Sequence, residues 1–368
     1  MCIRDRHRNV FGLEPTFRDP LRRQLFKLVR GTVERLFFLD QLSRLYEAAS
    51  QRREGEDFLA AAVRVMNVSV EVDPEDLARV PRSGSLMIVA NHPFGGIEGL
   101  VLLHLLRQTR PDLKLLANYL LRRMPETHEF SIFVNPFGGR DASRANIGAI
   151  KTGVRWIAEG HALLVFPAGE VSHLDIRRRE VVDPRWNPTI ARMIRRARAT
   201  ALPIFVEGRN SALFQMLGLV HPRLRTALLP WEMWNKQGAR LRLRIGNPVP
   251  FERLDAFKDD AEMMDYLQLR TYILRGRLQT EKKADTAISV SRKQAEMAPI
   301  APPLYPESIA QDIYLLPPES LLLETEEFAV YIARAQQIPR LLHEIGRLRE
   351  ITFRAAGEGT GREIDLDR

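Results

Sequence analysis

The strongest constraint on the fold is the alternation of short apolar runs with helical stretches between residues 58 and 250. Each run has the length of one strand, and the stretches between them carry apolar residues at helical spacing. Strands that are apolar on both faces belong to sheets covered by helices on both sides. We therefore predict an α/β fold with a central sheet flanked by helices. The expected strands are 85–90, 113–117, 132–134, 162–166, 201–206 and 241–245, and the expected helices include 97–107, 145–159 and 190–198.

Composition divides the chain into four segments. We predict a leader with amphipathic helices at residues 1–56 and the α/β domain at 57–280. A linker is predicted at 281–303, and the truncated start of a second domain at 304–368. The linker is charged and proline-rich and has no apolar periodicity. The last segment is too short to bury a stable core by itself, so we expect only the beginning of a domain there. Residues 1–6 lack the apolar run of a targeting signal and resemble adapter sequence read into a gene.

The charge balance predicts a negatively charged partner. The chain holds 55 Lys and Arg against 46 Asp and Glu, a net charge of +9, which suits nucleic acid, an anionic lipid surface or an acidic substrate. Aromatic residues are 8% of the chain and no nucleic-acid motif accompanies the charge, which argues against nucleic acid. Runs such as Arg177-Arg178-Arg179 either contact phosphate or carboxylate groups or lie on a solvated face.

Two further features bear on location. The helical region at 20–53 carries basic residues beside Phe and Leu, so it either packs as a helical pair on its own domain or lies on a membrane surface. A single cysteine, Cys2, leaves no disulfide framework and no thiolate set for a structural zinc. We therefore expect a cytosolic setting and no metal.

The most informative motif joins the strand that ends at Ala90 to the helix that begins at Ile97. Ligands of α/β proteins bind at the carboxyl ends of strands, so His92 is placed to meet a substrate and to act as a general base. Glu98 is the nearest carboxylate that can orient the imidazole ring. On one continuous helix the six residues from His92 to Glu98 would rotate the side chain by ~600° about the helix axis, so the two side chains would point in different directions. A glycine turn must therefore bring them together. A capping or core histidine is the alternative.

Three more polar segments follow apolar runs. In the first, two glycines precede Arg140 and Arg144 at a helix start, where the arginines either clamp an anionic group or are solvated. In the second, Gly169 is a candidate backbone donor to an oxyanion, and Glu170 is a candidate partner for an arginine of that clamp. The third polar segment ends the apolar run at residues 201–211. The chain has no G-x-S-x-G, H-E-x-x-H or glycine-rich nucleotide loop.

These four segments, in this order, resemble the lysophospholipid acyltransferase superfamily, which includes the acylglycerol-phosphate acyltransferases. The likeness is greatest to a bacterial branch described as hemolysins or ornithine-lipid O-acyltransferases. The segment from Asn91 to Glu98 is similar to the superfamily's Asn-His-x4-Asp motif, with one extra residue and Glu for Asp. VNPFGGRDASR, VFPAGEVS and ALPIFVEGRN stand where the other three blocks lie, although Ala168 replaces the glutamate of the third block.

The resemblance implies a mixed sheet and transfer of a fatty acyl group from acyl carrier protein or coenzyme A to a hydroxyl of a lysophospholipid or lyso-ornithine lipid. His92 would be the base and Glu98 its orienting partner, without metal or cofactor. The implied substrate-binding residues are Asn91, Arg140, Arg144, Gly169 and Glu170.

The resemblance also bears on location and on the end of the chain. It implies a cytoplasmic enzyme on the inner face of the cell membrane, in contact with anionic lipid. Residues 328–354 resemble the opening of an N-acyltransferase domain related to the GNAT fold. The alternative function is a non-catalytic peripheral membrane-binding protein, which would not need His92.

Overall fold

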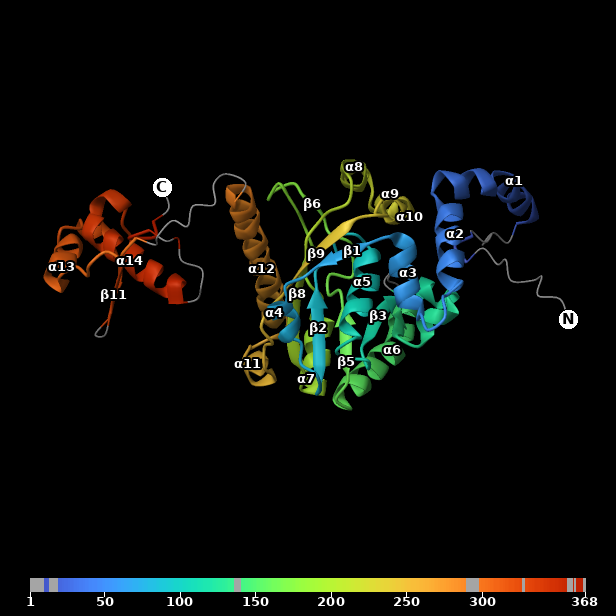
Figure 1. Cartoon of the computed structure of the whole chain (residues 1–368), viewed down its shortest axis with the longest axis horizontal. Helices are drawn as coiled ribbons and strands as arrows, with labels where there is room; N and C mark the ends of the chain where they lie inside the picture. Colours follow the sequence, from blue (N-terminus) through green and yellow to red (C-terminus); the bar gives the residue numbers. More distant parts are fainter. Residues whose placement is uncertain are drawn as a thin grey trace. The chain divides into compact units, whose positions relative to one another are not determined.

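The chain forms two compact units, residues 1–284 and 285–368 (Figure 1). The computed structural model describes residues 10–12, 19–135, 140–288, 298–325, 328–355, 360 and 362–366. The proposed adapter residues 1–6 lie outside this set. The predicted linker begins inside a helix, because α12 (Asp260–Ile288) continues past residue 281. Its last turns hold Glu, Lys and Ala, which favour helix and contain no breaker.

The first unit is built on a seven-stranded sheet in the order β1-β9-β8-β2-β5-β3-β4. Only the β8–β9 pair is antiparallel within it, which confirms a mixed central sheet. The six predicted strands are present, and the sequence pattern missed the short β1 and the β6–β7 hairpin. The bounds are β1 Ser69–Glu71, β2 Leu86–Ala90, β3 Lys114–Asn118, β4 Ser131–Val134, β5 Ala162–Val165, β6 His173–Asp175, β7 Glu180–Val182, β8 Thr200–Val206 and β9 Arg240–Ile245.

Helices cover both faces of the sheet, as the apolar strands require. In β2, Ile88 packs into the core that holds α3 and α5, while Val89 packs into the core that holds α6, α7, α11 and α12. Helix α5 has no polar face and is buried, with Glu98 in its first turn. The bounds are α3 Phe58–Met66, α4 Pro74–Ala78, α5 Ile97–Leu106, α6 Arg140–Ala158, α7 Pro188–Ala197 and α11 Phe251–Asp255.

Three short helices lie at the end of the sheet toward which β2 points, together with the β6–β7 hairpin (Figure 1). They are α8 Ala212–Val220, α9 Pro222–Ala227 and α10 Leu229–Trp234. Because the active sites of such sheets lie at the carboxyl ends of the strands, these helices are placed to border a site.

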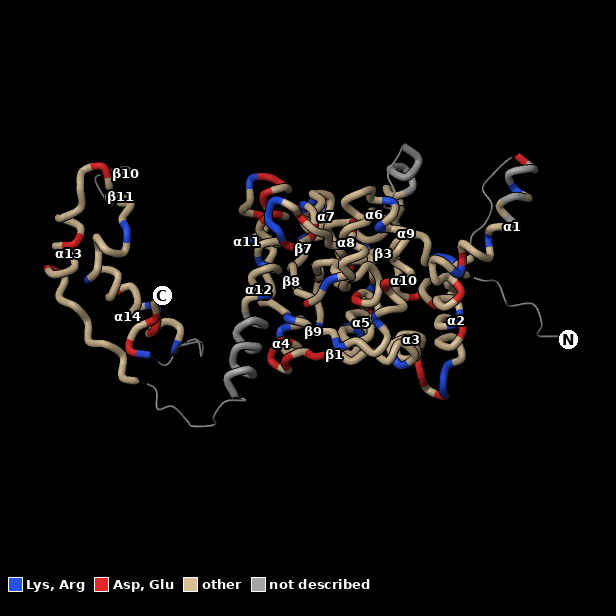
Figure 2. The backbone as a smooth tube through the Cα atoms, turned by 90° about the horizontal axis from the view of Figure 1, so that it is seen from above, with Lys and Arg blue, Asp and Glu red and all other residues tan. Residues whose placement is uncertain are grey.

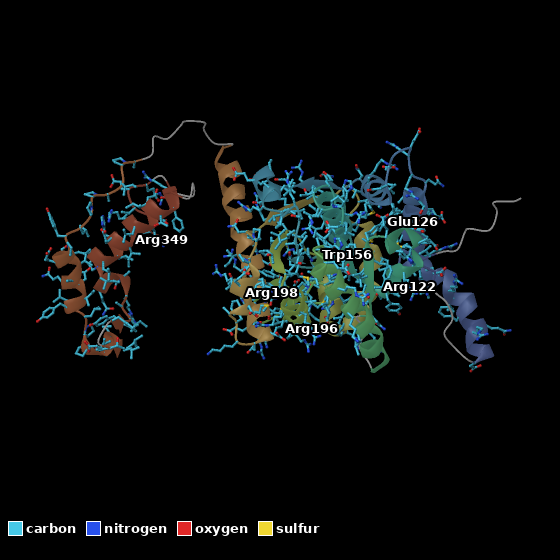
Figure 3. All side chains as sticks on the ribbon, turned by 90° about the horizontal axis from the view of Figure 1, so that it is seen from below. Arg122, Glu126, Trp156, Arg196, Arg198 and Arg349 are labelled. Carbon is cyan, nitrogen blue, oxygen red and sulfur yellow. The ribbon has the colours of Figure 1, made fainter. Side chains whose placement is uncertain are left out.

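The amino-terminal helices are α1 (Pro20–Leu36) and α2 (Leu39–Ser50). Helix α2 packs against α3, and Tyr46 donates a hydrogen bond of 2.7 Å to Glu126 in the 3-10 turn η2 (Pro125–His128). Glu126 is labelled in Figure 3 beside Arg122 of η1 (Tyr119–Arg123). Burial and the Glu126 carboxylate together raise the pKa of Tyr46 to about 12. The packing agrees with the helical-pair interpretation of this region.

The second unit contains α13, a β-hairpin and α14. Asp312 accepts hydrogen bonds from the N–H groups of Arg340 and Leu341, at 2.6 and 2.9 Å, and so caps α14. The two strands of the hairpin pair antiparallel, and both are exposed. The bounds are α13 Pro306–Tyr314, η3 Pro318–Ser320, β10 Leu321–Glu324, β11 Ala329–Tyr331, η4 Ala335–Gln337 and α14 Pro339–Ala355.

No helix in the described part of the chain combines the length and the apolar character needed to cross a bilayer.

A buried arginine fixes the amino ends of the central strands. Arg110 is almost fully buried and makes two hydrogen bonds, of 2.7 and 2.8 Å, to Asp112. It also donates to the carbonyl groups of Pro81 and Gly84, before β2, and of Gly160, before β5.

We predict that Arg110→Met lowers the free energy of unfolding by about 3 kcal/mol, because the buried carbonyl groups and Asp112 lose their partner. Arg185→Met, which breaks a pair with Asp265 between two side chains that are both exposed, should cost less than about 1 kcal/mol. Urea denaturation followed by tryptophan fluorescence measures both, since all four tryptophans lie in residues 1–284. Equal losses in the two variants would contradict the prediction.

Candidate active site

The site begins where β2 ends, at Asn91. This side chain is buried, and its amide nitrogen donates to the Val206 carbonyl at 2.9 Å while its oxygen accepts from the Val206 N–H at 2.7 Å. The side-chain amide of Asn91 therefore holds the end of β2 against the end of β8 through both its nitrogen and its oxygen. Substrate contact by Asn91 stays a prediction, whereas its structural contact is direct.

The loop after Asn91 closes around the carboxylate of Glu98. The N–H groups of Phe94, Gly95 and Gly96 donate to it at 2.9, 2.9 and 3.0 Å. Gly95 has a φ of 94°, and a Cβ there would lie 2.7 Å from the Leu229 side chain and 2.8 Å from the Val171 side chain. The glycine turn expected from the sequence is thus present, and a larger residue at Gly95 would strain the backbone and displace Leu229 and Val171.

The turn brings His92 and Glu98 together. Nδ1 of His92 lies 2.9 Å from Oε1 of Glu98, whose side chain is fully buried. Burial raises the pKa of Glu98, but the charge and hydrogen bond of His92 and the loop N–H groups outweigh it and lower the pKa to about 2. An ionised Glu98 this close to Nδ1 favours the tautomer that keeps its proton on Nδ1, and in that tautomer Nε2 can take a proton from a ligand.

Separate contacts hold the imidazole ring and the backbone of His92. The ring stacks on Phe166 at the end of β5, with ring centroids 4.2 Å apart. The His92 N–H donates to Asp183 at 3.2 Å, and its carbonyl accepts from the Ser172 N–H at 2.8 Å. About 17% of the side chain remains exposed, so the ring is fixed in position and still accessible.

Asp183 is a carboxylate of the site that sequence reasoning missed. It is buried and accepts hydrogen bonds from Ser172 Oγ at 2.5 Å and from Trp186 Nε1 at 2.9 Å. Burial raises its pKa. Asp183 follows β7 in a plain Val-Asp-Pro sequence, and only the Ser of VFPAGEVS offered a hint of the cluster.

The structure places Gly169 and Glu170 differently from the expectation. The Gly169 N–H already donates to the Phe166 carbonyl at 3.0 Å, so it closes a turn and is not a free donor to an oxyanion. Glu170 does pair with an arginine, but with Arg225 of α9, at 2.8 Å. The pair borders an open groove of about 590 Å³ between the β6–β7 hairpin and α8–α9.

Arg140 and Arg144 lie in the first two turns of α6, and their side chains fall outside the described part of the structure. The start of α6 follows β4, which is parallel to β3, β5 and β2 across the sheet. The carboxyl ends of these strands lie at one edge of the sheet. The helix that carries both arginines therefore starts on the same edge as His92.

A model of the acyltransferase family matches residues 37–281, a range that includes the seven-stranded sheet and the loop that carries His92 and Glu98. The chain belongs to the acyltransferase family. It is therefore an enzyme of acyl transfer, and the paired His92 and Glu98 lie inside the family segment.

Individual relatives were also found. The chain is 27% identical over 234 residues to a lyso-glycine lipid O-acyltransferase of Phocaeicola vulgatus, a match that covers 61% of this chain and 80% of the relative. A shorter match, 58% identical over 38 residues, is to a glycine N(alpha)-acyltransferase of Bacteroides thetaiotaomicron and covers 10% of this chain and 11% of the relative. The crystal structure of the 1-acyl-sn-glycerophosphate acyltransferase PlsC from Thermotoga maritima aligns with a TM-score of 0.38 at 16% identity, over 69% of this chain and 92% of that one.

The low pKa of Glu98 predicts how the stability of this acyltransferase depends on pH. The folded-state pKa of about 2 lies below the ordinary 4.5, so the ionised group stabilises the fold above pH 4.5 and loses this contribution as the pH falls toward 2. Glu98→Gln should therefore be about 3 kcal/mol less stable than the native chain at pH 7, with a gap that narrows below pH 4.5. Urea unfolding of both proteins between pH 7 and 3 tests this, and a gap constant to pH 3 would contradict it.

Proposed function

We propose that this acyltransferase moves a fatty acyl group from a thioester to the hydroxyl of a lyso-lipid with an acidic headgroup. The observation that carries the proposal is the contact between His92 and the buried Glu98 at the carboxyl edge of the sheet. The relative from Phocaeicola vulgatus, which is named as a lyso-glycine lipid O-acyltransferase, supports the acceptor class.

In the proposed reaction, Nε2 of His92 takes the proton of the acceptor hydroxyl as its oxygen attacks the thioester carbonyl. A new C–O ester bond forms, the C–S bond breaks, and the departing thiolate takes the proton back from the imidazole ring. Glu98 keeps the ring in the tautomer with Nδ1 protonated and stabilises the positive charge that develops on it. Phe166 stacks on the ring and fixes its plane. The reaction needs no metal, because a thioester is already an activated acyl group.

The acceptor's headgroup is the finer part of the proposal. Arg140 and Arg144, at the start of α6, are proposed to bind its phosphate or carboxylate, because arginine forms paired hydrogen bonds with such groups. A lyso-glycine, lyso-ornithine or lysophosphatidic acceptor offers this chemistry. Acyl carrier protein and coenzyme A are both acidic and are the proposed donors to a chain of net charge +9.

The location and the second unit complete the proposal. We propose a cytoplasmic enzyme that associates peripherally with the inner face of the cell membrane, where its acceptor lies. We propose that the second unit is related to an N-acyltransferase, which the resemblance of residues 328–354 and the short match to a glycine N(alpha)-acyltransferase support. The proposed role of that unit is separate from the chemistry at His92.

We predict that His92→Ala lowers kcat by between about 10² and 10⁴, the usual contribution of a general base, with little change in KM. His128→Ala is the matched control, because this exposed histidine bonds to the Arg122 carbonyl, away from the Glu98 pair. The assay supplies labelled acyl carrier protein or acyl coenzyme A together with lyso-glycine lipid, lyso-ornithine lipid and lysophosphatidic acid.

The outcomes separate the alternatives. Transfer that is lost in His92→Ala and kept in His128→Ala supports the base, and the best acceptor identifies the headgroup. Equal transfer by His92→Ala and the native protein would refute the role of His92. No transfer by the native protein with any donor would favour the non-catalytic membrane-binding alternative.

A further inference from the structure

The end of the molecule that holds His92 carries exposed apolar side chains on α8, α9 and the β6–β7 turn. Helical spacing puts Leu213, Met216 and Val220 on one side of α8, opposite the buried Phe214 and Gln215. We name as the α8 patch the six large apolar residues that are exposed here, each between 42% and 74%: Ile176, Leu213, Met216, Leu219, Val220 and Leu224. These residues lie on elements that contact one another, since α8 packs against both α9 and β6, and such a gathering of exposed apolar side chains is typical of an interaction surface.

Arginines border the α8 patch. The β6–β7 turn runs Ile176-Arg177-Arg178-Arg179, and all three arginines are exposed, as is Arg223 of α9. Figure 2 views this end from above and shows the turn in blue. The nearby acids are engaged: Asp175 contacts Arg178 and accepts two backbone N–H groups, Glu180 pairs with Arg275, and Glu170 pairs with Arg225. Apolar side chains rimmed by exposed arginines match the chemistry of an anionic bilayer surface.

The α8 patch is joined directly to the loop of the site. The Leu174 N–H, in β6, donates to Gln215 of α8 at 2.9 Å, and the Ser172 N–H, just before β6, donates to the His92 carbonyl at 2.8 Å. Leu219 and Ile176 also line the groove of about 590 Å³ that Glu170 and Arg225 border. A bilayer on the patch would therefore lie at the mouth of this groove.

We propose that the α8 patch docks the enzyme on an anionic lipid surface. The apolar side chains enter the headgroup region, and Arg177, Arg178, Arg179 and Arg223 contact lipid phosphates. Docking there lets a lyso-lipid reach the His92 edge of the sheet by a short movement out of the bilayer. This inference rests on the proposed function for its substrate, but it concerns a surface that contains none of the proposed catalytic residues.

The test is sedimentation of the full chain with vesicles of phosphatidylglycerol and phosphatidylcholine, or of phosphatidylcholine alone. Met216→Asp with Val220→Asp should weaken binding to the anionic vesicles about tenfold or more, because two apolar side chains no longer enter the bilayer. Arg177→Ala with Arg223→Ala should weaken it about 25-fold, at about fivefold for each arginine, and should have little effect on neutral vesicles.

The matched control is Leu269→Asp with Ile273→Asp on α12, where the same change falls on side chains of similar exposure, 58% and 59%. This control should bind as the native chain does. A second control, Leu36→Asp on α1, measures how much the amino-terminal helices contribute to vesicle binding. Native-like binding by the patch variants, or loss of binding in the α12 control, would overturn the proposal.

Vesicle binding is measured without turnover, so it stands or fails independently of the proposed reaction. Transfer to a short-chain, monomeric lyso-lipid should remain native-like in the patch variants, which also shows that they are folded. Loss of that transfer with acyl carrier protein as donor, but not with acyl coenzyme A, would instead make the patch a protein-docking surface and overturn the membrane assignment.

Discussion

The site depends on one buried carboxylate. Glu98 lies at the amino end of an apolar helix that passes through the core, where an isolated charge would be unstable. The charge is compensated by three loop N–H groups, by the positive amino end of the helix dipole and by His92. The same contacts determine the path of the loop, since the backbone must turn around the carboxylate to reach it. The geometry of His92 is therefore a consequence of how the chain satisfies Glu98.

The surrounding elements hold this arrangement from several directions. Asn91 fastens the loop to β8, Phe166 supports the ring from β5, and Asp183 and Ser172 bind the backbone of His92 from the segment that carries the β6–β7 hairpin. Gly208, with a φ of 141°, leaves room for Phe94, because a Cβ there would lie 2.1 Å from the ring. An imidazole ring held in this way spends little time in other orientations, which is the preorganisation that the base proposed at His92 requires.

Much of the fold was predictable because its strands are apolar on both faces and its helices fill the intervals. The strands at 86–90, 162–165 and 200–206 are found where the apolar runs predict them. Strand β1 and the β6–β7 hairpin were missed, since three-residue strands carry too little pattern to detect. The predicted start of the linker at residue 281 lies within α12, which continues to Ile288, because charge and loss of apolar periodicity do not by themselves end a helix.

The sequence by itself determined the strand–loop–helix unit in which His92 precedes two glycines and a glutamate, because turn residues and apolar runs act locally. It also determined the excess of arginine and the apolar character of α8. Only the tertiary structure decided that Glu98 faces Nδ1 of His92, that Glu170 pairs with Arg225, and that Asp183 supports the loop. These contacts join residues from separate strands and helices, and their partners are chosen by the order of the strands and by the need to satisfy buried polar groups.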